Sequence, residues 1–237
     1  MINKDYILRM AERFGRYLAI ILRLREYNKQ EEALLYIDEL FLQTTGLTTG
    51  FINSASEEML LNLISPLGVL NVEKCLWMAV LLQQEGDIYV ELGKSNESYY
   101  RYLKALHLFL EVASHDSDVK DIDITMAIED ILNKLAEYEL PLKTKNKIFR
   151  YFEKMGSYAR AEDVLFEMVE EKEKEPADNE IIEQGIAFYN RLLKKSDTDL
   201  KAGNLSRQEV EEGLAQLESK RNESKDAPYE GDQDKTT

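Results

Sequence analysis

Three side chains of metal-binding type follow one another at intervals of four residues: His107, Glu111 and His115. On a helix this spacing places them along one face, as a zinc or iron site requires. The chain has only two histidines and shows no evident fourth ligand, so we expect no metal and no cofactor. The alternative hypothesis is a metal-dependent or small-molecule-binding enzyme that uses this region.

Cationic side chains form a second pattern, with Lys143, Lys147, Arg150 and Lys154 at steps i, i+4, i+7 and i+11. One helix face that carries four positive charges in an acidic protein could receive a carboxylate or an acidic peptide. The alternative is that these cations pair with the helix that follows. The acidic residues of that helix are Glu162, Asp163, Glu167, Glu170 and Glu171.

A third cationic pattern lies near the N-terminus, where Arg9, Arg13 and Arg16 recur on one predicted helix. Residues 1–25 contain six basic and two acidic residues, which gives a net charge of +4. A basic amphipathic helix can lie on anionic lipid or bind an acidic partner. The alternative is an ordinary terminal helix that caps an acidic domain.

Composition excludes several functional classes. The net charge of −15 repels a phosphate backbone, so we expect no nucleic-acid binding. The sequence contains no Gly-rich phosphate loop, no nucleophile elbow and no dinucleotide fingerprint. The only cysteine, Cys75, lies in an apolar run, which excludes an intramolecular disulfide and fits a reducing cytoplasm. Apolar runs are too short for a stable membrane insertion or an export signal, so we expect a cytoplasmic protein.

The elements that position these residues are predicted to be helices. Only 4 prolines and 11 glycines occur in 237 residues, too few for the turns of an all-β fold. Apolar residues recur at three- and four-residue steps, and a loop is expected over 44–50. The predicted helices span about 4–27, 30–45, 56–64, 71–92, 95–114, 124–140, 144–155, 159–174, 179–195 and, weakly, 206–219.

One all-α domain over residues 1–219 accounts for this pattern. The remaining segment, 220–237, is acidic and polar, and it cannot bury enough apolar area to offset the entropy of ordering. We therefore expect it to be a disordered tail.

The pair of predicted helices over 71–92 and 95–114 resembles a tetratricopeptide repeat. Small and aromatic residues stand where such a hairpin needs them, namely Gly86, Tyr89, Gly93, Ser98, Tyr102 and Ala105. The resemblance implies antiparallel hairpins stacked as a right-handed superhelix, with a groove that holds partner peptides. Projected onto this chain, the groove positions are Val80, Gln83, Asp87, Val90, Glu91, Lys143, Asn146, Arg150, Glu153 and Lys154. Lys147 of the cationic stripe joins them in the predicted binding site.

The segments 1–10, 14–18 and 31–34, taken with that hairpin, also resemble an uncharacterised family of helical proteins from Gram-positive bacteria that carries no assigned activity. This resemblance implies a bacterial helical protein and no reaction. Because the constrained residues serve helix packing, we predict a non-catalytic scaffold. Its partner is expected to be a protein or peptide, in particular an acidic one.

Overall fold

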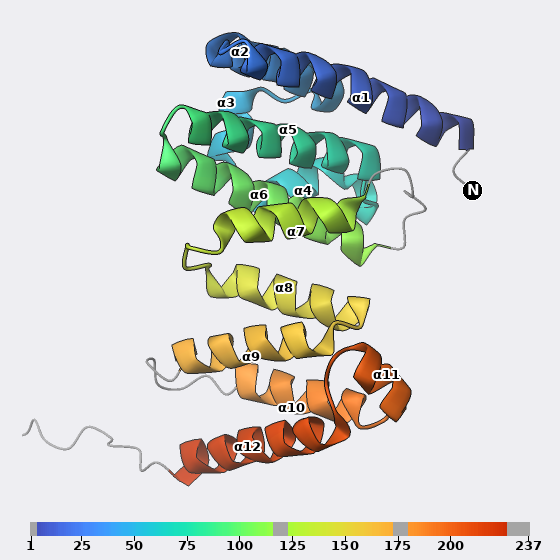
Figure 1. The fold of residues 1–237 in the computed structure, drawn as a ribbon, viewed down its shortest axis with the longest axis vertical. Helices are drawn as coiled ribbons and strands as arrows, with labels where there is room; N and C mark the ends of the chain where they lie inside the picture. The colour runs from blue at the N-terminus through green and yellow to red at the C-terminus, as the bar shows by residue number, and fades with distance from the viewer. Residues whose placement is uncertain (1–3, 116–122, 173–179, 227–237) are drawn as a thin grey trace, which may run out of the picture. The chain divides into compact units, whose positions relative to one another are not determined.

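The computed structural model describes residues 4–115, 123–172 and 180–226, and over these residues it is helical without strands (Figure 1). The helices are α1 (Lys4–Glu26), α2 (Gln30–Thr45), α3 (Thr49–Ser54), α4 (Glu57–Ile64), the 3₁₀ helix η1 (Pro66–Gly68), α5 (Val72–Glu91), α6 (Ser95–Ser114), α7 (Ile124–Leu135), α8 (Leu142–Met155), α9 (Tyr158–Lys172), α10 (Glu180–Leu192), α11 (Asp197–Ala202) and α12 (Arg207–Asp226). The predicted all-α class is confirmed, and no helix in the described part is long and apolar enough to cross a membrane.

Two short helices were not predicted. The expected loop over 44–50 gives way to α3, because the Thr48 hydroxyl accepts a hydrogen bond from the backbone of Phe51 and so caps its start. Helix α11 begins in the same manner, with a capping box between Ser196 and Asp199. Each of these helices has about one and a half turns, too few to show a repeated pattern of apolar residues. A side-chain cap at its start stabilises each of them instead.

The C-terminal helix also differs from prediction. Helix α12 continues to Asp226, past residue 220, where the disordered tail was expected to begin. Arg221 lies 3.8 Å from Glu183 of α10, so an ion pair holds this added turn where apolar residues are absent. Residues 227–237 of the expected tail lie outside the described part of the chain.

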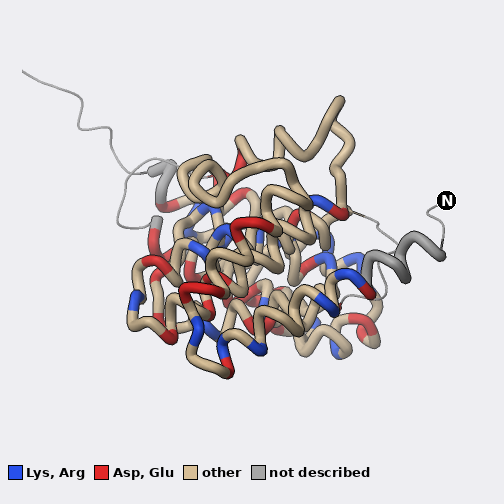
Figure 2. Tube along the Cα trace, turned by 90° about the horizontal axis from the view of Figure 1, so that it is seen from above, with Lys and Arg blue, Asp and Glu red and all other residues tan. Residues whose placement is uncertain are grey.

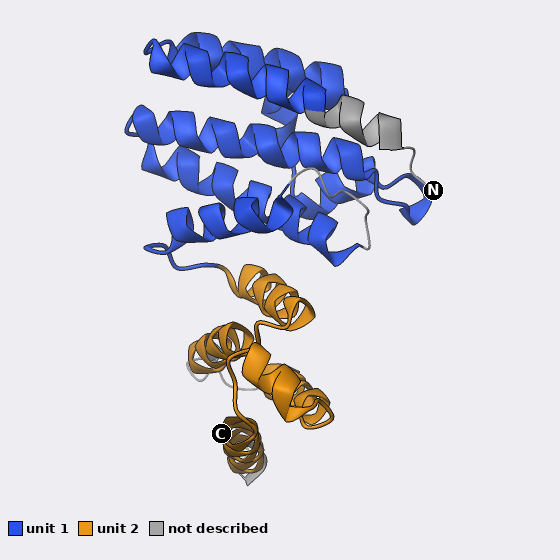
Figure 3. Ribbon diagram, turned by 45° about the vertical axis from the view of Figure 1, so that its right-hand side comes forward, with its two compact units in different colours: residues 1–140 blue, residues 141–237 orange. Residues whose placement is uncertain are grey.

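The chain divides into two compact units, unit 1 (residues 1–140) and unit 2 (residues 141–237) (Figure 3). The prediction of a single domain over 1–219 concerns how these units fold together, and it stays a prediction.

Helix α5 forms the centre of unit 1, packed against α2 on one side and α6 on the other, with α7 packed against α6. The side chain of Asn71 caps its start by accepting a hydrogen bond from the Lys74 backbone. The helix ends just before Gly93, whose φ of +69° is left-handed. The backbone N–H of Lys94 then donates a hydrogen bond to the carbonyl of Tyr89 at 2.8 Å. Gly93, which the sequence places between the two predicted helices, therefore ends the first of them in a left-handed conformation.

A close approach of α5 and α6 depends on Gly86. A Cβ atom at this position would lie 2.5 Å from Cε1 of Tyr102, so the absence of a side chain makes room for the ring. Nearer the start of α5, Trp77 stacks on Phe14 of α1 with ring centroids 3.6 Å apart. These contacts fix α5 against α1 and α6 and set the positions of the polar residues at its C-terminal end.

Unit 2 is built from the hairpin α8 and α9, followed by α10, which packs against α9 and α12. The hairpin turns on Gly156, with a left-handed φ of +74°. Close packing of α10 and α12 depends on Gly213, because a Cβ atom there would overlap the ring and hydroxyl of Tyr189. Tyr189 is fully buried as a result.

Candidate functional site

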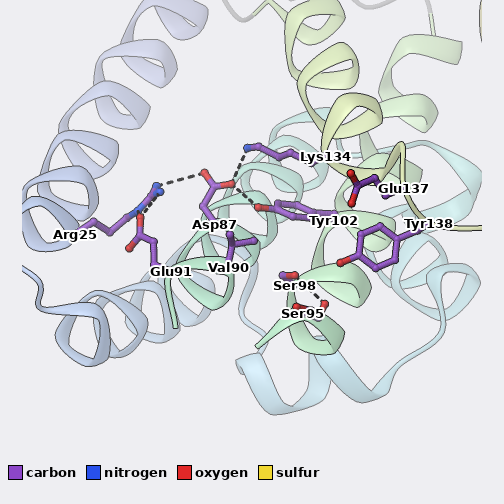
Figure 4. Close-up of a pocket in the computed structure, with 10 residues that line it drawn as sticks. All are labelled: Arg25, Asp87, Val90, Glu91, Ser95, Ser98, Tyr102, Lys134, Glu137 and Tyr138. Atoms are coloured by element: carbon purple, nitrogen blue, oxygen red, sulfur yellow. Dashed lines mark hydrogen bonds and ion pairs between the residues drawn. The ribbon is translucent and has the colours of Figure 1, made fainter. Parts of the chain in front are cut away.

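A cavity of about 490 Å³ lies in unit 1, where the C-terminal ends of α1 and α5 meet the start of α6 and the end of α7 (Figure 4). It is lined by Arg25, Asp87, Val90, Glu91, Ser95, Ser98, Tyr102, Lys134, Glu137 and Tyr138. These residues are far apart in the sequence, and the packing of α1, α6 and α7 around α5 brings them together. This cavity is our candidate functional site.

Asp87 is the centre of the hydrogen-bond network in the cavity. Its Oδ1 atom accepts hydrogen bonds from the Tyr102 hydroxyl and from Nζ of Lys134, both at 2.7 Å. Its Oδ2 atom accepts one from Nη1 of Arg25 at 3.3 Å. Three helices therefore converge on a carboxylate that a fourth, α5, supplies.

Arg25 connects this carboxylate to a second one. Its Nη2 atom lies 2.7 Å from Oε1 of Glu91, and its Nη1 atom also donates to Gln84 at 3.0 Å. Gln84, Asp87 and Glu91 follow one another at steps of three and four on α5, so they share one helix face. A single arginine from α1 thus contacts two turns of α5.

Lys134 forms the equivalent link from α7. Its Nζ atom lies 2.6 Å from Asp130, one turn earlier on α7, in addition to its contact with Asp87. Burial alone would lower the pKa of Lys134, but hydrogen bonds to Asp130 and Asp87 outweigh it and raise the pKa. Lys134 therefore stays charged at neutral pH.

Tyr102 also keeps its proton at neutral pH. Burial raises the pKa of Tyr102, and the hydrogen bond to Asp87 raises it further. The hydroxyl is thus a fixed donor to Asp87.

At the mouth of the cavity, Tyr138 is 39% exposed and its ring packs on Tyr99, with centroids 5.0 Å apart. Val90 is also exposed at this mouth, so apolar surface borders the charged network.

A second polar cluster lies behind the cavity, on the other side of α5. Glu85 is 1% exposed, and Nε of Arg101 donates to it at 3.1 Å. Burial raises the pKa of Glu85 to about 7, because the loss of hydration outweighs the attraction of Arg101. The nearby Lys104 donates to the backbone carbonyls of Ile52 and Asn53 at 2.8 and 2.7 Å, which ties α3 to α6.

Three of the predicted groove residues, Asp87, Val90 and Glu91, line the cavity. Gln83 lies one turn from Asp87, where its amide donates to Asp130 at 2.8 Å. Sequence reasoning missed Arg25, Lys134 and Tyr138 as parts of this site. The periodicity of each helix indicates its buried face, but it does not indicate which charged side chains of separate helices meet.

The predicted groove residues of unit 2 lie on α8. Asn146 exchanges two hydrogen bonds with Gln184 of α10, at 3.1 and 3.3 Å. Lys145 of α8 forms an ion pair with α9, because its Nζ atom lies 3.0 Å from Oε2 of Glu171. Lys145 was not counted in the predicted stripe. For that stripe, namely Lys143, Lys147, Arg150 and Lys154, the choice between binding and pairing stays a prediction.

The residues of the metal hypothesis do not converge. His107 is buried, whereas His115 is exposed and bonds through Nδ1 to the backbone carbonyl of Glu111 at 2.9 Å. Among the residues that the structure describes, no group of three or more His, Cys, Asp or Glu is arranged to hold a metal ion. The enzyme alternative therefore has no ligand cluster in this part of the chain.

Of the N-terminal cationic residues, Arg13 lies 3.6 Å from Glu73 at the start of α5. This pairing fits the predicted role of a terminal helix that covers an acidic domain.

Comparison with known proteins identifies a family but no function. A family model described as "Family of unknown function (DUF6483)" matches residues 1–222, and the chain belongs to this family. No curated protein and no solved structure matches it. The match fits the expected membership of an uncharacterised family, while the tetratricopeptide resemblance stays a prediction.

Proposed function

We propose that this member of the DUF6483 family is a non-catalytic scaffold that binds a segment of a partner protein in the cavity of unit 1. We further propose that its hairpins stack as a right-handed tetratricopeptide-like superhelix, so that the cavity opens on the groove side. The observation that carries the proposal is the convergence of four helices on Asp87 at the wall of an open cavity. A rigid, pre-organised wall lowers the entropic cost of binding.

The chemistry of the lining supports binding more than catalysis. Both oxygens of Asp87 already accept hydrogen bonds from neighbouring side chains. The raised pKa of Tyr102 keeps its hydroxyl protonated at neutral pH. Neither group is therefore placed to remove a proton from a substrate, which is what a general base must do.

A cation is the ligand group that suits this lining best. Arg25 and Lys134 are bonded to Asp87, whereas Glu137 makes no hydrogen bond or ion pair within the described residues. Glu137 is thus the charge that is left for a ligand. The partly exposed ring of Tyr138 lies next to it in the chain and offers a face to an ammonium or guanidinium group. We propose that the partner segment places a lysine or arginine side chain here.

Two labelled peptides of one uncharged sequence, with a central Lys or a central Glu, test this proposal by fluorescence anisotropy. The Lys peptide is expected to bind at least about tenfold more tightly, which is the effect of one charge contact of ordinary strength. Glu137→Gln should remove this preference. The matched control is Glu139→Gln, because Glu139 is exposed on the same segment but does not line the cavity. Failure of the Lys peptide to bind, or an undiminished preference in Glu137→Gln, would contradict the proposal.

The acidic partner that was expected for the stripe on α8 is a separate prediction, because that stripe belongs to unit 2. The cytoplasm as compartment likewise stays a prediction, in keeping with the buried thiol of Cys75.

A further inference from the structure

An uncharged surface lies on the segment that links the first hairpin to α5. Residues 59–72 contain no charged side chain, although charged residues make up 32% of the chain and basic and acidic positions are intermixed along its trace (Figure 2). Four of its apolar residues are exposed: Met59 by 49%, Leu63 by 51%, Leu67 fully and Val69 by 70%. We call these four residues the α4 patch. Exposed apolar side chains that cluster in this way typically mark an interaction site.

The four residues lie on one short piece of structure. Met59 and Leu63 are one turn apart on the same face of α4. The chain then folds back through η1, because the Asn71 backbone bonds to the carbonyl of Ile64 at 2.8 Å and the Gly68 backbone to that of Ser65 at 3.0 Å. The loop that carries Leu67 and Val69 is thereby tied to the end of α4.

The backbone of Leu67 is a second, independent observation. Its φ of +58° and ψ of +27° are left-handed, a conformation that costs free energy for a leucine and that Gly or Asn would adopt more readily. The side chain is fully exposed and gains nothing from packing within the chain. A strained residue that presents an apolar side chain to water is explained if that side chain packs against another molecule.

Charge identifies this segment as the surface where two copies of this chain can meet. Each copy carries a net charge of −15, so two copies repel one another across most of their surface. Repulsion is weakest where charged residues are absent, which is the case over 59–72. An anionic membrane would require basic residues beside the apolar ones, whereas the residues that precede the patch are Glu57 and Glu58.

We propose that the α4 patch is the contact through which two copies of unit 1 associate. In a two-fold symmetric dimer the same patch faces itself, with Leu67 of each copy against α4 of the other. Because the patch is small, the dimer is weak and forms at high protein concentration. Higher salt strengthens the association, since it screens the repulsion between the two acidic copies.

Sedimentation of the full chain over a range of concentrations and salt tests this proposal. The average mass is expected to rise above the 27.5 kDa of one chain as protein and salt concentrations increase. Leu67→Asn should weaken the association at least tenfold. Because Asn tolerates the left-handed backbone, the melting temperature of this variant should stay equal to that of the wild type or rise.

The matched control is Leu35→Asn, which replaces a leucine that is 68% exposed on α2, outside the patch. This variant should associate like the wild type. A wild-type chain that stays monomeric throughout, or Leu67→Asn and wild-type chains that associate equally, would overturn the proposal. Binding of the wild type to anionic vesicles without self-association would also overturn it, in favour of a lipid surface.

Discussion

Tyr102 of unit 1 and Tyr189 of unit 2 have the same immediate surroundings. Each ring lies against a glycine of a neighbouring helix, Gly86 for the first and Gly213 for the second. Each hydroxyl also donates a hydrogen bond to a carboxylate. Tyr102 bonds to Asp87 at 2.7 Å, and Tyr189 bonds to Glu162 at 2.6 Å. In both units, a glycine lets two helices approach and a carboxylate satisfies the buried hydroxyl.

The two carboxylates differ in what else they contact. Asp87 forms ion pairs with Arg25 and Lys134 and lines a cavity. Glu162, in contrast, has no ion pair with a cation in the described part of the chain. Burial raises the pKa of Glu162, and nearby acidic residues add to this effect. In unit 2, the hydrogen bond between Tyr189 and Glu162 is enough to bury the tyrosine without any cation. The extra charges in unit 1 are therefore not needed to hold a tyrosine, which is why we assign them to the site.

The largest expected effect comes from Gly213→Ala. The new methyl group would overlap the fully buried Tyr189, so the free energy of unfolding of unit 2 should fall by about 3 kcal/mol. Urea denaturation followed by far-ultraviolet circular dichroism measures this loss. The only tryptophan, Trp77, belongs to unit 1, and its fluorescence transition should stay in place.

Gly86→Ala is the companion variant in unit 1. Tyr102 borders the cavity and can move toward it, so the loss should be about 1 kcal/mol, reported by Trp77 fluorescence. Equal losses in the two variants would show that the tyrosine of unit 1 is as confined as that of unit 2, and the comparison would fail.

The second effect concerns Glu85, which is buried and accepts a hydrogen bond from Arg101. Burial raises the pKa of Glu85 from its ordinary 4.5 to about 7, so the folded state holds a proton over this range that the unfolded state has lost. The contribution of Glu85 to stability is thus greatest below pH 4.5. It falls as pH rises to about 7, by roughly 2 kcal/mol.

Urea titrations between pH 5 and pH 8, followed by Trp77 fluorescence, measure this dependence. Glu85→Gln should flatten the curve, because the amide does not titrate. A slope that is unchanged in this variant would assign the pH dependence to other groups.

The smallest effect separates the two hydroxyl groups. Tyr189→Phe leaves Glu162 without its donor, and we expect a loss of about 1.5 kcal/mol. Tyr102→Phe leaves Asp87 with Arg25 and Lys134, and we expect about 0.5 kcal/mol. Thermal denaturation of both variants decides the order. A larger loss in Tyr102→Phe would mean that the charged network depends on the hydroxyl and does not replace it.

The helices of this chain could be predicted, whereas only the part of the site on α5 could be. The three- and four-residue period of apolar side chains located the main helices, and Gly93 marked the turn between α5 and α6 in advance. Asp87 was selected as a groove residue, but its partners Arg25 and Lys134 lie 62 and 47 positions away. Such contacts depend on how hairpins stack, which a helical period does not encode.

The two short helices could not be predicted either, because the sequence pattern that identifies a helix needs several turns. Helices α3 and α11 have six residues each, too few for an apolar period to be recognised. Their capping residues, Thr48 and Ser196, were present in the sequence, but a threonine or serine also occurs in most loops. A local cap becomes informative only together with the tertiary contacts that hold the helix.

Lys104 gives unit 1 a cooperative link that its helix pairs alone do not provide. Six residues are too few for a stable helix in water, so α3 persists because the ammonium group of α6 binds the carbonyls at its C-terminal end. Local opening of α3 would leave this buried charge without its acceptors. The amide protons of α3 should therefore exchange with solvent only when α6 also opens, so that an insert of six residues unfolds as part of the central hairpin.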